Sequence, residues 1–189
     1  FLKNLGYYWA PNDYFDATLS GDFYDRIGFN YRADVRYTVR YLLNGQINGK
    51  YMPKDLNTRA KRRRWSISIA HNQDIDPTMT IRANGRFQSD KDVERQYSSN
   101  FTSRTNQSIY SSFSLSKRWK GTKNSMSLSA TRDENLQNGN IRYTFPSLRF
   151  SRSQSTIYEM FSGSNTAGKK NWYQKIYFSY YSNLIRRGS

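Results

Sequence analysis

The chain contains no cysteine and a single histidine, His71. Without cysteine there is no disulfide framework, no zinc site built on thiolates and no cysteine nucleophile. A single histidine also excludes the metal sites that need a histidine pair. We therefore expect neither an enzyme nor a bound cofactor or metal. His71 precedes Asp74 and Asp76, and we interpret this polar stretch as a turn, because Asn, Asp and Pro favour turns.

Apolar residues are also scarce. They make up 36% of the 189 residues, and the mean hydropathy is -0.92, whereas soluble globular domains contain roughly 45–50% apolar residues. No apolar run approaches the roughly 18 residues of a transmembrane helix. This composition would suggest disorder, but aromatic residues form 16% of the chain. A sequence that is polar on average, rich in Tyr and poor in Pro indicates a strand-rich protein with one wet face.

Apolar and polar residues alternate along most of the sequence. From residue 29 to residue 40, every odd position is apolar or aromatic and every even position is polar. A strand sends successive side chains to opposite faces, whereas the helical period of 3.6 would mix them. The same alternation returns as far as residue 180, which predicts an all-β chain of about ten strands. We expect strands 14–24, 28–39, 43–52 and 78–88 to join in sequence order as an antiparallel meander.

One face of the predicted sheet is apolar, and no amphipathic helix is present in the sequence to cover it. Short connections near 11–13, 40–42, 72–77 and 120–124 alternate with others near 25–28, 53–63, 89–106 and 133–139, as in transmembrane barrels. Segment 151–171 breaks this rule, because it is long where a short turn is due. Aromatic residues at the strand ends are typical of the membrane interface; they are Tyr7, Trp9, Phe15, Trp65, Trp119 and Trp172.

These features predict an antiparallel up-and-down meander that forms an arc of a transmembrane outer-membrane β-barrel. We treat residues 1–189 as a single barrel segment. The chain opens at Phe1 rather than Met, and we expect it to be a piece of a longer protein. Pro146 falls at a strand position, where it removes a donor from the ladder, so we expect a break or an edge there.

The formal charge of +16 has two interpretations. Nucleic-acid binding would gather basic residues in one patch, interleaved with aromatic residues for stacking. A barrel lumen would spread them at alternate strand positions. Only Lys61 to Arg64 form a true cluster, which we interpret as a solvated loop that could touch anions at the cell surface. Because the alternation puts aromatic and basic residues on opposite faces, we do not expect nucleic acid as a partner.

The alternation divides the candidate site residues into two sets. The candidate lumen-facing residues are Asp16, Asp22, Arg32, Asp34, Arg36, Arg40, Arg82 and Arg86. The candidate lipid-facing residues are Phe29, Tyr31, Val35, Tyr37, Val39, Ile81 and Phe87. The arginines could grip lipid phosphates, since a guanidinium binds phosphate through two parallel hydrogen bonds. They could instead balance the aspartates of the same face, and the pattern favours this second interpretation.

Five segments, in order, resemble the lipopolysaccharide-assembly outer-membrane protein family (LptD), and the likeness spans nearly the whole chain. They are residues 4–14 (NLGYYWAPNDY), 65–79 (WSISIAHNQDIDPTM), 116–122 (SKRWKGT), 143–148 (YTFPSL) and 172–176 (WYQKI). The resemblance implies a large barrel in the cell outer membrane that receives lipopolysaccharide from periplasmic bridge proteins, opens sideways and inserts the lipid into the outer leaflet. It also implies a lipoprotein plug inside the barrel and contact with outer-membrane lipids.

The family further has a periplasmic N-terminal β-domain, which this segment does not contain. About ten strands cannot close a barrel of that size, so the chain would be one arc of the wall, and no residue identifies the lateral gate. The alternative is the wall of another outer-membrane barrel, such as a porin or a ligand receptor. Only the resemblance separates these two functions, and a periplasmic β-domain upstream of Phe1 would favour lipid export.

Overall fold

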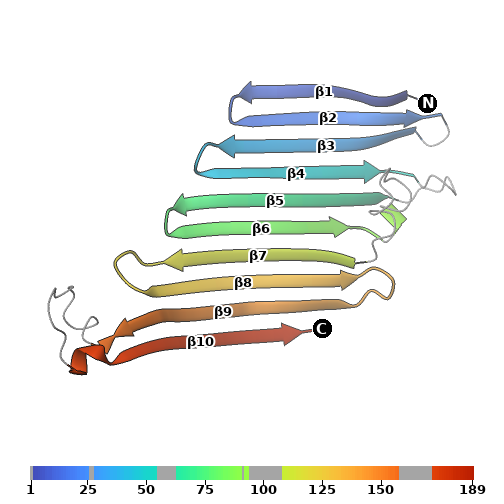
Figure 1. The fold of residues 1–189 in the computed structure, drawn as a ribbon. Coiled ribbons are helices and arrows are strands. Elements are labelled where there is room, and N and C mark those ends of the chain that lie inside the picture. The colour runs from blue at the N-terminus through green and yellow to red at the C-terminus, as the bar shows by residue number, and fades with distance from the viewer. Residues whose placement is uncertain (1, 26–27, 55–62, 91, 94–107, 158–171) are drawn as a thin grey trace.

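The computed structural model describes residues 2–25, 28–54, 63–90, 92–93, 108–157 and 172–189. Within these residues ten strands form one sheet in the order of the sequence, and every neighbouring pair is antiparallel (Figure 1). The predicted all-β meander is therefore confirmed. The strands are β1 (Leu2–Asn12), β2 (Phe15–Tyr24), β3 (Gly28–Val39), β4 (Leu43–Met52), β5 (Arg64–Asp76), β6 (Met79–Gln88), β7 (Ser108–Arg118), β8 (Asn124–Asn135), β9 (Ile141–Thr156) and β10 (Tyr177–Gly188).

The sheet does not close on itself within the described residues, because β1 and β10 lie at its opposite edges (Figure 1). The turns 13–14, 40–42, 77–78 and 119–123 lie at one end of the strands, together with the connection between β9 and β10, which includes the short 3₁₀ helix η1 (Trp172–Lys175). We call this end the short-turn edge. The other ends of the strands form the opposite edge of the sheet, which we call the long-loop edge. Of the long connection expected at 151–171, residues 151–156 belong instead to β9, and residues 158–171 lie outside the described residues.

Two of the expected connections are shorter than predicted. The expected turn at 72–77 shrinks to residues 77–78, because β5 continues to Asp76. Asn72 pairs with Asn44 of β4 and Arg82 of β6, so the ladder runs on through the polar residues. The connection expected near 133–139 likewise begins only after Asn135. Turn-forming side chains do not prevent a strand where both neighbouring strands supply backbone partners.

Across the sheet, the register places apolar residues opposite apolar residues and polar residues opposite polar residues. Val35 pairs with Ala17 of β2 and Ile47 of β4, and Ile47 pairs with Ile69 of β5. Side chains of directly opposed residues point to the same side of a sheet. We call this side the apolar face; it carries Leu19, Val35, Ile47, Ile67, Phe87, Leu115, Leu128 and Leu148. The polar face carries Thr18, Asp34, Asn48, Ser68, Arg86, Ser114, Ser127 and Arg149.

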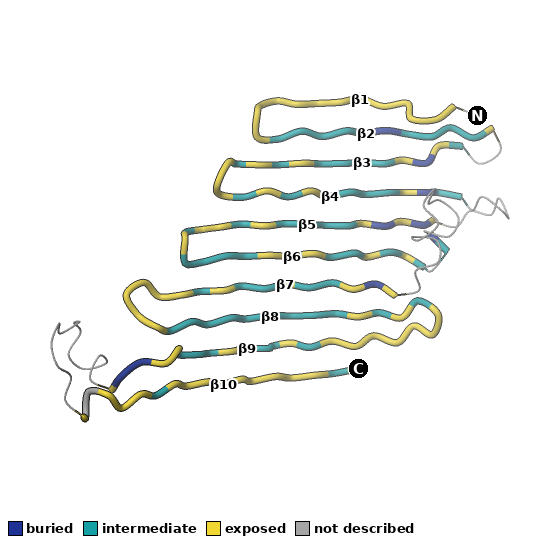
Figure 2. The backbone as a smooth tube through the Cα atoms, viewed as in Figure 1, coloured by how far each residue is buried: buried dark blue, intermediate teal, exposed yellow. Residues whose placement is uncertain are grey.

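The described residues bury very little apolar surface. Met52, Val93 and Ile109 are the buried hydrophobic side chains among them, whereas Leu19 remains 58% exposed and Tyr31 48% exposed on the apolar face. Figure 2 shows exposed positions along both edge strands and repeatedly along the inner ones. A water-soluble sheet would cover such a face with a second layer. No helix among the described residues has the length and apolar character needed to cross a membrane.

Pro146 lies inside β9, which pairs with β8 on one side and β10 on the other. Both ladders are irregular beside it: the β8 register shifts between Ser129 and Thr131, and the β10 register shifts between Ile185 and Arg187. Proline has no N–H to donate, so a regular ladder cannot pass through it. The expected break is confirmed, and Pro146 does not mark a sheet edge.

Candidate functional site

Ion pairs neutralise the polar face where β2 meets β3. Arg36 Nε lies 3.0 Å from Asp16 Oδ1, and Arg32 Nη2 lies 3.3 Å from Asp22 Oδ2. Asp16 and Arg36 are directly opposed in the register. This arrangement supports the interpretation that these arginines balance aspartates of the same face. That these arginines and aspartates face a barrel lumen remains a prediction.

The structure separates the candidate site residues by face, with one exception. Arg82 and Arg86 share the polar face of β6, because they pair with Asn72 and Ser68. Arg40 lies one residue beyond β3, in the turn, and its guanidinium carbon sits 4.7 Å from the centre of the Tyr41 ring. The register puts these predicted lipid-facing residues on the apolar face: Phe29, Tyr31, Val35, Tyr37, Val39, Ile81 and Phe87.

Three shallow hollows on the polar face are lined by residues that the structure describes. The first, of about 680 Å³, lies beside the Asp16–Arg36 pair and is also lined by Tyr8, Asn44 and Asn72. The second, of about 490 Å³, is lined mainly by hydroxyls and amides with Arg86. The third, of about 330 Å³, lies at the short-turn edge between β6 and β9. Its lining residues are Pro77, Thr78, Thr80, Ser116, Lys117, Arg118, Ser125, Met126, Ser127, Arg149 and Ser151.

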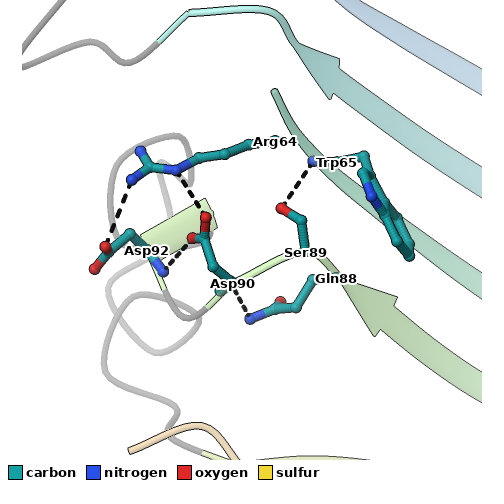
Figure 3. Close-up of polar contacts among 6 residues, drawn as sticks. All are labelled: Arg64, Trp65, Gln88, Ser89, Asp90 and Asp92. Atoms are coloured by element: carbon teal, nitrogen blue, oxygen red, sulfur yellow. Dashed lines mark hydrogen bonds and ion pairs between the residues drawn. The ribbon is translucent and has the colours of Figure 1, made fainter. Parts of the chain in front are cut away.

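A buried arginine ties the segment after β6 to the start of β5 at the long-loop edge (Figure 3). Arg64 is 1% exposed, and its guanidinium lies 3.0 Å from Asp90 and 3.5 Å from Asp92. Asp90 also accepts a hydrogen bond from the backbone N–H of Asp92. The interpretation of Lys61 to Arg64 as a solvated loop is thus wrong for Arg64, which begins β5, whereas Lys61 and Arg62 lie outside the described residues. Its acidic partners lie in a distant part of the sequence, so the local basic run could not reveal them.

His71 lies on the apolar face, within the stretch that its composition predicts to be a polar turn. It occupies β5 opposite Gly45 of β4 and Ala83 of β6. Its Nδ1 lies 2.8 Å from the hydroxyl of Tyr37, and its Nε2 lies 3.4 Å from Oε1 of Gln73. The polar-turn interpretation is therefore wrong for residues 71–76, and the turn itself lies at 77–78. A signal was present in the sequence, because His71 continues the odd-numbered series of Trp65, Ile67 and Ile69 on one face.

A second polar cluster holds the turn between β5 and β6. Asp76 accepts hydrogen bonds from the hydroxyl and the backbone N–H of Thr78, and its other oxygen lies 3.1 Å from Lys117 Nζ. Lys117 also donates to Thr78 Oγ1 at 2.9 Å. Among the described residues, no group of three or more His, Asp or Glu side chains could hold a metal ion.

The two-faced sheet defines a class of protein. An up-and-down meander with an exposed apolar face, an opposite face of hydroxyls, amides and guanidiniums, and unequal connections at its two ends is the architecture of an outer-membrane β-barrel wall. A profile described as LptD protein matches residues 1–189. The chain belongs to the LptD family, a family of outer-membrane proteins involved in lipopolysaccharide transport and assembly. A search among curated proteins finds no match to the chain.

Proposed function

We propose that this chain forms one arc of an outer-membrane translocon that delivers lipopolysaccharide to the outer leaflet. Family membership supports the cargo. The observation that carries the proposal is the separation of the two faces. The apolar face exposes large side chains such as Leu19 and Ile47, which suits contact with lipid tails. The polar face offers hydroxyls, amides and guanidiniums over many strands, which suits a hydrated sugar headgroup.

The same proposal gives the arc a role as a wall and not as a catalyst. Two carboxylates of the polar face are held in ion pairs where β2 meets β3, Asp16 by Arg36 and Asp22 by Arg32. A carboxylate occupied by a guanidinium suits the balancing of charge on a wall rather than contact with a reacting group. The partners that fit this role are lipopolysaccharide, outer-membrane lipids, a lipoprotein plug and periplasmic bridge proteins. The location that fits it is the cell outer membrane.

Site-specific photo-crosslinking in the full-length protein tests the conduit. Arg82 and Ile81 are neighbours in β6 and lie on opposite faces, and Arg36 and Tyr37 form the same kind of pair in β3. In cells that export lipid, a photo-reactive residue at Arg36 or Arg82 should form adducts with lipopolysaccharide, and the same probe at Tyr37 or Ile81 should not. Adducts at neither polar position would reject the conduit and leave the arc as passive scaffold.

Depletion of the full-length protein separates lipid export from the other barrel functions. If the protein delivers lipopolysaccharide, depletion should remove the lipid from the cell surface before the integrity of the membrane fails. A porin or a ligand receptor would leave surface lipopolysaccharide at its normal level. Complementation with the unaltered protein is the control, and it should restore the surface lipid.

A further inference from the structure

The third hollow of the polar face differs from the first in its charge. The first hollow is lined by Asp13, Asp16 and Arg36, so its one guanidinium meets carboxylates. No carboxylate appears in the lining of the third hollow as far as the described residues show. Its lining includes Lys117, Arg118 and Arg149, of which Arg118 and Arg149 lie on the polar face. The two hollows therefore lie on the same face of the sheet but differ in charge. The carboxylates of the first would repel an anion, and the guanidiniums of the third would attract one.

Lys117 belongs to the other face of β7, because it lies opposite Met79 and Met126 of the apolar face. Lys117 is held by Asp76 at 3.1 Å and by Thr78 at 2.9 Å. Arg118 and Arg149 are exposed, and within the part of the chain that the structure describes neither forms an ion pair. Arg149 has its guanidinium carbon 5.6 Å from the centre of the Tyr181 ring. Such a contact uses the flat face of a guanidinium and leaves its N–H edges available to an oxyanion.

Serine hydroxyls lie between these two arginines. Arg118 of β7 is opposed to Ser125 of β8, and Arg149 of β9 is opposed to Ser127 of β8. Two guanidiniums thus flank a strand that presents two hydroxyls. Ser125 Oγ and Ser151 Oγ lie 2.8 Å apart, which shows that side chains from β8 and β9 meet on this face. Guanidiniums supply paired donors for phosphate oxygens, and hydroxyls both donate and accept, as the hydroxyls of a sugar require.

The hollow also has a defined place in the proposed conduit. It lies at the short-turn edge, beside the turn of residues 77–78. In transmembrane barrels the short turns face the periplasm. The hollow would then meet a headgroup on the side from which the cargo enters. Its volume of about 330 Å³ is enough for a phosphorylated sugar unit, since small-molecule sites begin near that size.

We propose that Arg118 and Arg149, with Ser125 and Ser127 between them, form a binding site for a sugar phosphate at the entry side of the conduit. This inference rests on the proposed function and adds the substrate chemistry that one part of the polar face recognises. Arg32 and Arg36, whose charges are met by aspartates, are assigned no phosphate contact at this site.

The test uses the purified full-length protein with a photo-crosslinking residue at Thr80, which lines the hollow from β6. Met79 is its neighbour on the apolar face and provides the position control. We expect lipopolysaccharide adducts at Thr80 and none at Met79. The double variant Arg118→Gln/Arg149→Gln should lower the adduct yield at least about tenfold, because charge-assisted hydrogen bonds are lost. The matched variant Arg186→Gln/Arg187→Gln removes two exposed arginines of β10 that do not line the hollow, and it should leave the yield unchanged.

Two further arms identify the chemistry that is recognised. Arg118→Lys/Arg149→Lys keeps the charge and should retain most of the adduct, which separates phosphate recognition from misfolding. Lipopolysaccharide stripped of its phosphates should give the low yield of the double Gln variant even with the unaltered protein. Inorganic phosphate should compete only at millimolar concentration. Competition at micromolar concentration would assign the hollow to the free ion and overturn the headgroup assignment.

The pattern of adducts shows whether only the phosphate site is wrong or the conduit is wrong as well. Adducts at Thr80 that persist in the double Gln variant and with stripped lipid would overturn the phosphate site while the conduit stands. Absence of adducts at Thr80, with adducts still present at Arg82, would also overturn the site alone. Absence of adducts at Thr80, Arg36 and Arg82 together would overturn both.

Discussion

The hydroxyl of Tyr37 and Nδ1 of His71 share a hydrogen bond of 2.8 Å that spans strand β4 on the apolar face. Gly45 lies between them and makes this contact possible, because it is opposed to both residues in the register. A Cβ atom on Gly45 would lie 2.3 Å from the end of the Tyr37 ring. The ring therefore covers the glycine, and the two polar groups meet above it on an otherwise apolar surface.

The first prediction concerns this contact. Tyr37→Phe should destabilise the full-length barrel in lipid by about 1–3 kcal/mol, because His71 loses a hydrogen-bond partner in surroundings poor in water. Gly45→Ala should have a similar effect, since the tyrosine ring must move away from the new methyl group. Equilibrium unfolding in urea, with the protein in lipid vesicles, measures both changes in the free energy of unfolding.

A double variant separates this mechanism from a general intolerance of Gly45. Tyr37→Leu removes the ring, so Gly45→Ala added to it should cost little more. The two changes should then be strongly non-additive, as expected for residues in direct contact. Additive effects would show that Gly45 serves another purpose and that the ring does not need the space above it.

The second prediction tests the facing of the strands. Val35 lies on the apolar face and Thr38 on the polar face of the same strand. Val35→Arg should cost about 2–4 kcal/mol in lipid if the site lies near the bilayer midplane. Thr38→Arg is the matched control and should be nearly neutral. Equal stability of the two variants in lipid vesicles would contradict the membrane assignment.

The third prediction concerns the buried arginine at the long-loop edge. Arg64→Ala should destabilise the barrel by about 3–5 kcal/mol, because Asp90 and Asp92 lose the cation that compensates them. Asp92→Asn should cost less, since its contact is longer and Arg64 keeps Asp90. The adjacent Arg63, which is exposed, provides the control, and Arg63→Ala should leave the unfolding midpoint unchanged. A small effect of Arg64→Ala would show that the pair does not hold this edge.

The order and register of the strands could be predicted from the sequence because the alternation has an unambiguous phase. Strands expected at 28–39 and 43–52 are found at Gly28–Val39 and Leu43–Met52. A slip of one residue would move Val35 and Ile47 to the polar face, so the pattern allows one register. The resemblance to the LptD family could likewise be recognised from the sequence, because its motifs are spread over the whole chain.

The missed features depend on contacts between distant residues. The polar stretch from Asn72 to Asp76 has the composition of a turn, and only the partners in β4 and β6 make it a strand. Arg64 looks like part of a solvated basic run until Asp90 and Asp92 approach it. The third hollow combines Arg118 and Arg149 from two strands that flank a third. Local composition carries no information about such partners.

The last prediction decides between the two interpretations of the paired arginines. Arg36 and Asp16 are opposed in the register and form an ion pair whose side chains are 64% and 25% exposed. Asp16→Arg or Arg36→Asp alone puts like charges opposite each other, which is unfavourable. The swapped double variant restores an ion pair and should recover about 0.2–1 kcal/mol in a double-mutant cycle, as expected for a partly exposed pair.

The same swapped variant tests the contact with phosphate. It moves the cation from β3 to β2 and leaves the net charge of the face unchanged. If Arg36 only balances Asp16, the swap should leave surface lipopolysaccharide at its normal level, and we expect this result. If Arg36 grips the headgroup directly, the swap should slow export even though the barrel is as stable as before. Export after rapid induction, measured by labelling of the surface lipid, distinguishes the two, because stability and charge are matched and only the position of the guanidinium differs.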